Sequence, residues 1–226
     1  MGIKISRRKA LGLSIGFFAG LFSTLKADCE TTVSQTEGPF YPQDLSQEKD
    51  NDLTRIKGST QQATGNIVYI FGSVRDENCQ PIPKAIVEIW QACASGRYKH
   101  SEDTHNAPLD ENFQYWGRYI CDDSGRYAFK TIVPGPYPVN RNWWRPPHIH
   151  FKVTKRGYFE LTSQMYFAHH PLNKKDRILR KLSREEQQQV VVEFNNAQEN
   201  NNYRDFERLQ QNCRVGYFDI VLEKVY

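Results

Sequence analysis

Two histidines separated by a single residue are the most reactive pattern in this sequence. His148 and His150 lie in the segment Arg-Pro-Pro-His-Ile-His-Phe-Lys at 145–152. On an extended strand, alternate side chains share a face, and two such side chains are about 6–7 Å apart along the strand. Both imidazoles can therefore converge on one metal ion. The His-x-His pattern alone leaves open a pair of surface or hydrogen-bonded histidines.

Two tyrosines in turn-rich segments offer oxygen ligands. Tyr98 lies in Gly-Arg-Tyr-Lys-His at 96–100, and Tyr137 lies between two prolines, eleven residues before His148. Flanking prolines stiffen the backbone, which suits a preorganised ligand. Tyrosine is also a common loop and core residue, and the sequence contains 12.

The neighbourhood of the histidines narrows the choice of metal. No Asp or Glu lies close to His148 and His150 in the sequence, which disfavours the ferrous site made of two histidines and one carboxylate. Catalytic zinc usually takes a third histidine, a glutamate or cysteines. Phenolate is a hard anionic ligand, so a set of two tyrosines and two histidines favours Fe(III), which also binds catecholates well.

Short apolar runs separated by turn residues must position these side chains. Asp-Asp-Ser-Gly at 122–125 is one such turn, and no helical period lies between most of the runs. The pattern predicts an all-β fold with a β-sandwich core, although a barrel is also compatible. The irregular segments 92–118 and 133–147 are expected to be long active-site loops. The predicted strands are Ile67–Val74, Ile86–Gln91, Gly125–Thr131, Ile149–Thr154, Leu161–Phe167 and Tyr217–Lys224.

A short C-terminal helix is expected after Ser183. The sequence Ser-Arg-Glu-Glu at 183–186 has the spacing of a capping box, in which the serine side chain accepts an early backbone N–H. The apolar side of this helix is expected to comprise Val190, Val191, Phe194 and Ala197.

The first 27 residues carry the positive charge of the chain. The 226 residues contain 30 Lys and Arg against 26 Asp and Glu, and five of the basic residues lie within residues 1–27. A basic start, an apolar run over Leu11–Leu25 and the small residue Ala27 are typical of an export signal, and Ser6–Lys9 resembles a twin-arginine motif. An uncleaved anchor is the alternative, but the run is shorter than the about 20 residues of a membrane span. We therefore expect a periplasmic or extracellular protein.

The remainder, from residue 28 onward, has a formal charge of −1, with 25 basic and 26 acidic residues. This balance removes the main reason to expect nucleic acid or a membrane surface as a partner. Five cysteines have no Cys-x-x-Cys spacing, which argues against structural zinc. In an oxidising compartment they predict one or two disulfides, whose pairing the spacing leaves open.

Four segments together resemble the intradiol ring-cleavage dioxygenases, and most closely the protocatechuate 3,4-dioxygenase type. They are IPKAIVEIWQACASGRYKH at 82–100, DDSGRYAFKTIVPGPYPV at 122–139, WRPPHIHFKV at 144–153 and TSQMYF at 162–167. The resemblance covers roughly residues 36–167 together with the strand-like FDIVL at 218–222. It implies a β-sandwich core and a mononuclear non-haem Fe(III) cofactor.

The resemblance assigns roles to individual residues. It implies that the iron ligands are Tyr98, Tyr137, His148 and His150, with Tyr137 and His150 axial. It also implies that Arg145, Gln164 and Tyr137 are the catalytic residues, with Arg145 stabilising negative charge on the ring and Gln164 orienting it. The segment at 35–39 is similar to the family's pocket-lining arm. Val139 stands where protocatechuate enzymes often have tryptophan, which leaves the exact substrate open.

The sequence therefore predicts an Fe(III) dioxygenase that inserts both atoms of O2 into a catechol-type aromatic, with intradiol cleavage to a cis,cis-muconate-type diacid. Protocatechuate, catechol and hydroxyquinol are the candidate substrates, and a non-catalytic β-sandwich binding module or partner subunit is the alternative. We expect an oligomer, homo- or hetero-oligomeric. The predicted organisation is an export signal at 1–27, an N-terminal arm at 28–66 and a dioxygenase domain at 67–226.

Overall fold

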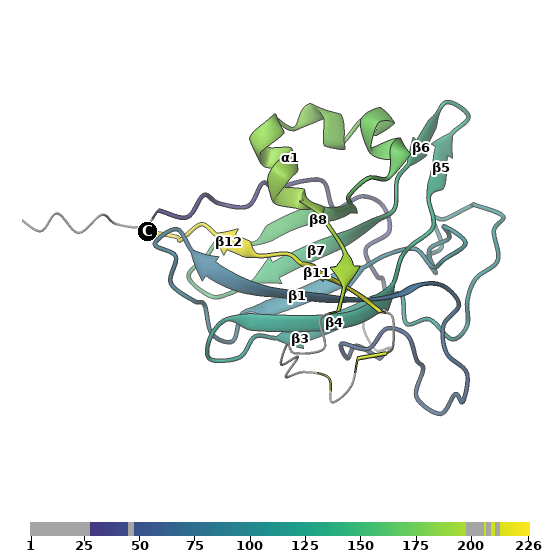
Figure 1. Cartoon of the computed structure of the whole chain (residues 1–226), viewed down its shortest axis with the longest axis horizontal. Helices are drawn as coiled ribbons and strands as arrows, with labels where there is room; N and C mark the ends of the chain where they lie inside the picture. The colour runs from purple at the N-terminus through teal and green to yellow at the C-terminus, as the bar shows by residue number, and fades with distance from the viewer. Residues whose placement is uncertain (1–27, 45–47, 198–205, 207–208, 211–212) are drawn as a thin grey trace, which may run out of the picture.

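The computed structural model describes residues 28–44, 48–197, 206, 209–210 and 213–226 (Figure 1). The predicted export signal at 1–27 lies outside these described residues. Among the described residues, no helix has both the length and the apolar character needed to cross a membrane.

The first of two five-stranded sheets is built around β1 (Ile67–Asp76), the longest strand. One edge of β1 pairs over Ile67–Ser73 with antiparallel β4 (Arg126–Ile132). The other edge is shared by two short parallel strands, β11 (Arg214–Tyr217) and β12 (Ile220–Leu222). The two-residue strand β10 (Asn195–Asn196) extends the sheet beyond β11.

The single C-terminal strand predicted over Tyr217–Lys224 is wrong. β11 ends at Tyr217 and β12 begins at Ile220, so Phe218 and Asp219 interrupt the predicted strand. The Asp219 carboxylate accepts hydrogen bonds from the backbone N–H and the hydroxyl of Ser73, both at 2.8 Å, and so occupies a pairing position of β1. At this position a side-chain carboxylate, rather than a backbone carbonyl, accepts the hydrogen bond from β1, and the predicted strand is divided into two.

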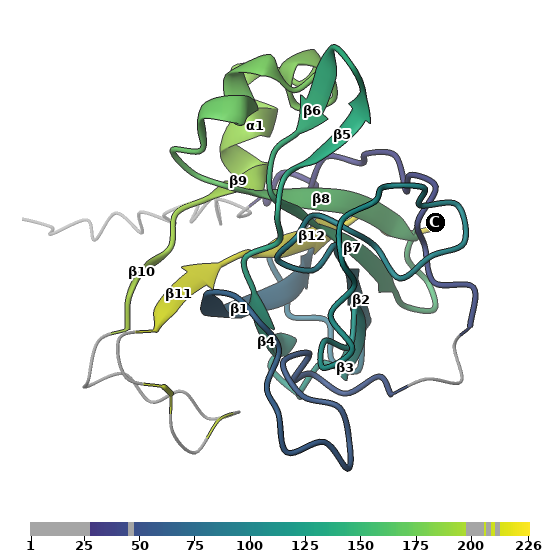
Figure 2. The same ribbon diagram turned by 90° about the vertical axis from the view of Figure 1, so that its right-hand side faces the viewer.

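The second sheet has the strand order β3-β2-β7-β8-β9 and lies face to face with the first (Figures 1 and 2). Residues with no solvent exposure from both sheets, such as Ile70 and Phe129 of the first and Ile89 and Phe151 of the second, form one apolar core. The all-β prediction is confirmed. The strands are β2 (Ile86–Trp90), β3 (Trp116–Ile120), β7 (His148–Thr154), β8 (Leu161–Phe167) and β9 (Val191–Val192).

Three strands overlap segments that were predicted to be irregular. β3 falls at the end of 92–118, and the hairpin of β5 (Tyr137–Asn140) and β6 (Trp143–Arg145) falls within 133–147. Pro138 cannot donate a backbone hydrogen bond, and the ladder of this hairpin is irregular between Pro138 and Asn140. Both segments otherwise remain long loops.

The C-terminal helix α1 (Arg184–Val190) begins as predicted. The backbone N–H of Glu186 donates to the Ser183 hydroxyl at 3.1 Å, and the Ser183 N–H donates to the Glu186 carboxylate at 2.7 Å, which completes the capping box. The predicted extension of its apolar side to Val191, Phe194 and Ala197 is wrong, because β9 begins at Val191 and pairs with β8. Two short 3-10 helices, η1 (Pro171–Lys175) and η2 (Leu179–Lys181), precede α1 beside the β5–β6 hairpin (Figure 2).

The segment before β1 lies along the edges of both sheets. The backbone of Gln35 donates to Thr162 of β8 at 2.8 Å, and that of Thr32 donates to Val221 of β12 at 3.0 Å. A disulfide joins Cys29 to Cys79, which follows β1, while Cys93, Cys121 and Cys213 are free and buried.

Reduction of the Cys29–Cys79 disulfide should destabilise the fold. The bond closes a loop with a sequence separation of 50, for which chain entropy predicts a stabilisation of about 4 kcal/mol. Urea denaturation with and without reductant measures this difference. The reductant should have no effect on the Cys29→Ser/Cys79→Ser double variant, and an unchanged midpoint for the parent protein would contradict the prediction.

Candidate active site

The two histidines lie on the outer face of the second sheet. Both belong to β7, and their ring centroids are 5.0 Å apart. Ile149 and Phe151 alternate with them along the strand and point into the apolar core. Both histidines are nonetheless 2% exposed, so other segments must cover this face.

Neighbouring strands surround the histidines with side chains on the same face. Trp90 of β2 pairs with His150, and the two rings stack at a centroid distance of 4.7 Å. On the other side, Gln164 and Tyr166 of β8 pair with His150 and His148 respectively. Side chains directly opposite each other in an antiparallel pair share a face. The alternation predicted from His-x-His therefore places Gln164 and Tyr166 on the same face of the sheet as the two histidines.

The two tyrosines reach this face of the sheet from two other segments of the chain. Tyr98 follows β2, and its backbone N–H donates to the Asp103 carboxylate at 2.6 Å. Tyr137 begins β5, directly opposite Arg145 of β6. The ring centroid of Tyr137 is 5.5 Å from that of Tyr98 and 5.6 Å from that of His148. The structure thus brings together the four residues that the resemblance implies as iron ligands.

Two glycines allow the tyrosine loops to approach each other. The backbone N–H groups of Gly96 and Gly135 both donate to the carbonyl of Cys93 at 2.9 Å. A Cβ atom on Gly96 would collide with the backbone oxygen of Pro136, next to Tyr137. Only the lack of a side chain permits this contact.

A Gly96→Ala substitution should therefore disrupt the site. Gly96 has a φ of +85°, and Gly157 has a φ of +89° with open space around its Cβ position. Gly157→Ala is the matched control, because both variants carry the backbone cost but only Gly96→Ala adds a clash. We expect Gly96→Ala to cost at least about 1–3 kcal/mol more in unfolding free energy. Equal stability losses in chemical denaturation would contradict this.

Three polar atoms of this cluster are buried without a hydrogen-bond partner among the described residues. They are the Tyr98 hydroxyl, His148 Nε2 and His150 Nδ1. Unpaired buried polar groups are costly, and a metal ion is one group that would satisfy them. The other nitrogen of His148, Nδ1, lies 2.7 Å from the Pro146 carbonyl, which orients the ring as outer hydrogen bonds commonly do for metal-binding histidines.

Burial disfavours the charged forms of all four side chains. Desolvation raises the pKa of the Tyr98 phenol well above its ordinary value and also raises the pKa of Tyr137. Desolvation, reinforced by the positive charge of Arg145, lowers the pKa of both His148 and His150 well below the ordinary value. The imidazoles are therefore neutral and able to ligate, whereas the phenols need a strong Lewis acid to become phenolates.

The donor set fits Fe(III). Among the described residues, no cluster of three or more His, Cys, Asp or Glu side chains is arranged to hold a metal. A metal at His148 and His150 would therefore draw on the oxygens of Tyr98 and Tyr137, and hard phenolate donors suit a ferric ion.

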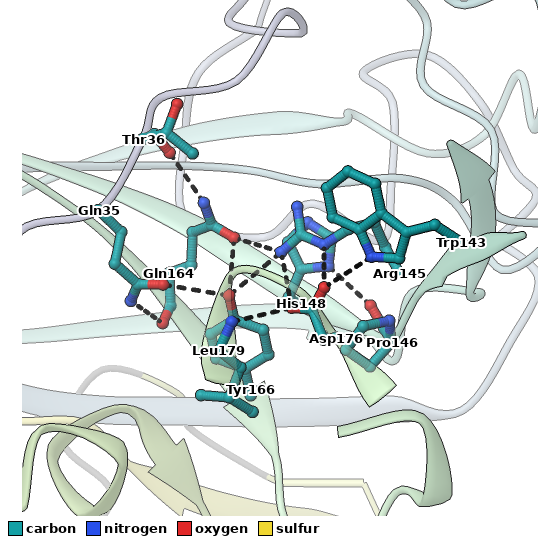
Figure 3. A network of polar contacts seen from close by, with 10 residues as sticks. All are labelled: Gln35, Thr36, Trp143, Arg145, Pro146, His148, Gln164, Tyr166, Asp176 and Leu179. Atoms are coloured by element: carbon teal, nitrogen blue, oxygen red, sulfur yellow. Dashed lines mark hydrogen bonds and ion pairs between the residues drawn. The ribbon is translucent and has the colours of Figure 1, made fainter. Parts of the chain in front are cut away.

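Arg145 is held by a buried ion pair that the sequence did not predict. Its guanidinium Nε lies 3.0 Å from the Asp176 carboxylate, and the two side chains are 4% and 0% exposed (Figure 3). Asp176 follows η1 and also accepts hydrogen bonds from the Trp143 indole at 3.2 Å and the Leu179 backbone at 3.3 Å. Asp176 lies among Lys174, Lys175 and Arg177, a composition typical of a solvated surface, so no sequence signal marked it.

Gln164 links Arg145 to the N-terminal segment. Its carbonyl oxygen accepts from Arg145 Nη2 at 2.6 Å, and its amide nitrogen donates to the Thr36 carbonyl at 2.8 Å (Figure 3). The hydroxyl of Tyr166 lies 3.0 Å from the same Gln164 oxygen and 3.1 Å from the Gln35 side chain. The segment at 35–39 thus contacts the site, as the resemblance implied.

A cavity of about 650 Å³ opens in front of the cluster. Tyr137, Arg145 and His150 line it, together with Phe40 and Val139. The volume is within the range of small-ligand sites, so an aromatic substrate of one ring fits.

Comparisons with known proteins agree with this site. The sequence profile of the family described as Dioxygenase matches residues 36–224. The chain is 38% identical over 178 residues to the protocatechuate 3,4-dioxygenase beta chain of Burkholderia cepacia, covering 76% of this chain and 71% of the relative. It is 33% identical over 113 residues to a chlorocatechol 1,2-dioxygenase of Pseudomonas sp. (strain P51), covering 44% of this chain and 43% of that relative.

Solved structures show the same fold. The dioxygenase domain of a carbohydrate-binding fusion protein from Streptomyces sp. SirexAA-E superposes with a TM-score of 0.61 at 26% identity, covering 87% of this chain and all of that chain. A 3-chlorocatechol 1,2-dioxygenase from Rhodococcus opacus superposes with a TM-score of 0.65, covering 86% of this chain and 73% of the other, and at 21% identity it supports the fold alone. Profile, relatives and fold agree that the chain belongs to the intradiol ring-cleavage dioxygenase family.

Proposed function

We propose that this protein is a non-haem Fe(III) enzyme that inserts both atoms of O2 into a catechol-type aromatic and cleaves the ring between the two hydroxyl-bearing carbons. The product would be a cis,cis-muconate-type diacid. The observation that carries the proposal is the buried cluster of two tyrosines and two histidines. In it, the Tyr98 hydroxyl and one ring nitrogen of each histidine have no hydrogen-bond partner among the described residues.

Tyr98, Tyr137, His148 and His150 would hold the iron. When bound there, Fe(III) supplies the Lewis acidity that favours the doubly deprotonated catechol and with it an electron-rich ring. Tyr137 lines the cavity, so its phenolic oxygen is placed to accept a proton from an entering catechol hydroxyl.

Arg145 supplies the fixed positive charge of the site. It lines the same cavity as Tyr137 and His150, where it can stabilise negative charge that develops on the ring. Its guanidinium cannot be deprotonated in a protein, so this charge is independent of pH. Gln164 and Asp176 fix its position through hydrogen bonds and the buried ion pair.

The proposal also covers the substrate class, the oligomeric state and the cellular location of the protein. Relatives named for protocatechuate, chlorocatechol and hydroxyquinol support catechols as a class, with protocatechuate, catechol and hydroxyquinol as the first to assay. A relative named as a beta chain supports an oligomer, homo- or hetero-oligomeric. The Cys29–Cys79 disulfide supports export to a periplasmic or extracellular compartment, because such bonds persist where conditions are oxidising.

Oxygen consumption by the iron-loaded full chain tests the activity. Catechol, protocatechuate and hydroxyquinol are supplied in turn, and the product is analysed by mass spectrometry under 18O2. We expect a ring-opened diacid that carries both labelled atoms. A non-catalytic binding module would bind the catechol without oxygen uptake, and that result with iron-loaded protein would overturn the proposal.

A further inference from the structure

The charged residues that line the cavity are mostly acidic. Of the described residues that line it, Glu102 and Asp103 are acidic and Arg145 alone is a fixed cation. The proposed function already assigns Arg145 to the ring itself, and Asp176, 3.0 Å from its guanidinium, offsets part of its charge. The cavity therefore presents two carboxylates and no uncommitted cation among its described lining residues.

The two carboxylates are not neutralised by neighbours. In the described part of the chain, neither Glu102 nor Asp103 forms an ion pair with a lysine or arginine within 4.0 Å. Asp103 is fixed in place, because its two oxygens accept from the backbone of Tyr98 at 2.6 Å and of His105 at 2.8 Å. Its negative charge therefore lies beside a proposed iron ligand.

The rest of the lining favours apolar groups. Prolines and aliphatic and aromatic side chains contribute much of the cavity wall, and Val139 is half exposed at its rim. The apolar lining residues are Pro39, Phe40, Pro138, Val139, Trp143 and Ile178. An uncharged substituent gains from contact with such a surface, whereas a carboxylate loses water there without a compensating partner.

We propose that this site selects catechols whose ring substituent is uncharged and discriminates against catechols that carry a ring carboxylate. The inference rests on the proposed dioxygenase activity and narrows its substrate class. It ranks protocatechuate, which is 3,4-dihydroxybenzoate, below its neutral analogues, in contrast to the substrate in the name of the Burkholderia cepacia relative.

The test compares 3,4-dihydroxybenzoate with its methyl ester on the iron-loaded full chain. The two differ in charge and by one methyl group. We expect kcat/KM to be at least about tenfold higher for the ester, which corresponds to about 1.4 kcal/mol, because the cavity carboxylates repel the charged substrate. Raising the salt concentration should increase kcat/KM for the acid but not for the ester, since salt screens charge and leaves shape unchanged.

The ester and the acid also differ in intrinsic reactivity. Comparing the ester-to-acid ratio between the parent and a variant cancels this difference, because the same two compounds are used with both proteins. Val139→Lys adds a cation to the cavity wall, and the ratio of ester to acid should fall about tenfold relative to the parent. Val139→Leu is the matched control and should keep the parent's ratio. Glu102→Gln, which removes one carboxylate, should also lower the ratio.

The outcomes separate this inference from the function on which it rests. If neither compound nor catechol is cleaved, the proposed function fails and the inference fails with it. If catechols are cleaved but the acid reacts as well as the ester, or the ratio does not respond to Val139→Lys, the enzyme stands and the proposed selectivity is overturned.

Discussion

Replacement of Asp176 by alanine should lower the free energy of unfolding by about 3–5 kcal/mol and reduce kcat at the same time. Asp176 is fully buried, and its carboxylate is the counter-ion of Arg145, itself only 4% exposed. Loss of the carboxylate leaves a guanidinium charge in the interior without a counter-ion. It also frees Arg145 to move away from the cavity in which the ring would bind. Chemical denaturation and steady-state kinetics measure the two effects.

Two further variants separate stability from positioning. Asp123→Ala removes one partner of an exposed ion pair, since the side chains of Asp123 and Lys84 are 90% and 65% exposed. This substitution should lower the free energy of unfolding by less than about 1 kcal/mol. The Arg145→Met/Asp176→Leu double variant removes both buried charges, and apolar replacement of a buried pair is often neutral for stability. It should recover most of the stability but none of the activity. A fully active double variant would show that Arg145 has no role in the reaction.

Replacement of His148 by alanine should abolish iron binding and turnover. Its Nε2 is buried without a hydrogen-bond partner in the described structure, and its Nδ1 lies 2.7 Å from the Pro146 carbonyl. The Nε2 atom is therefore available to bind a metal ion. Loss of an outer hydrogen-bond partner alone typically costs about 10- to 100-fold in metal affinity or activity, and loss of the ligand itself should exceed that. Metal analysis and oxygen uptake measure the two losses.

The exposed His169 provides the control for that experiment. Its side chain is 83% exposed and lies 3.5 Å from Glu193, at the surface and outside the cavity lining. His169→Ala should keep the iron content and the activity of the parent. A His148→Ala protein that retained stoichiometric iron would remove His148 from the proposed ligand set.

The sheet-forming part of the structure was predictable from local patterns. β8 has the predicted bounds, and the alternation of His148 and His150 with Ile149 and Phe151 correctly assigned opposite faces of β7. Period-two alternation depends only on backbone geometry, so a strand and its faces can be inferred without knowledge of its partners.

Features that depend on distant segments were not predictable. The two C-terminal strands exist because Asp219 bonds to Ser73, 146 residues earlier in the chain. Asp176 meets Arg145 across 31 residues, and its basic neighbours in the sequence conceal its burial. The strand β3 lay unrecognised at the end of a loop because its pairing with β2, rather than its own pattern, defines it.

The absorption spectrum of the iron-loaded protein tests the central claim most directly. If Tyr98 and Tyr137 bind Fe(III) with His148 and His150, charge transfer from phenolate to iron should give a red-brown colour that shifts when a catechol is added without oxygen. The Tyr98→Phe and Tyr137→Phe variants should each weaken the band. A protein that binds stoichiometric iron but remains colourless, or whose spectrum survives both substitutions unchanged, would contradict the assignment of this site.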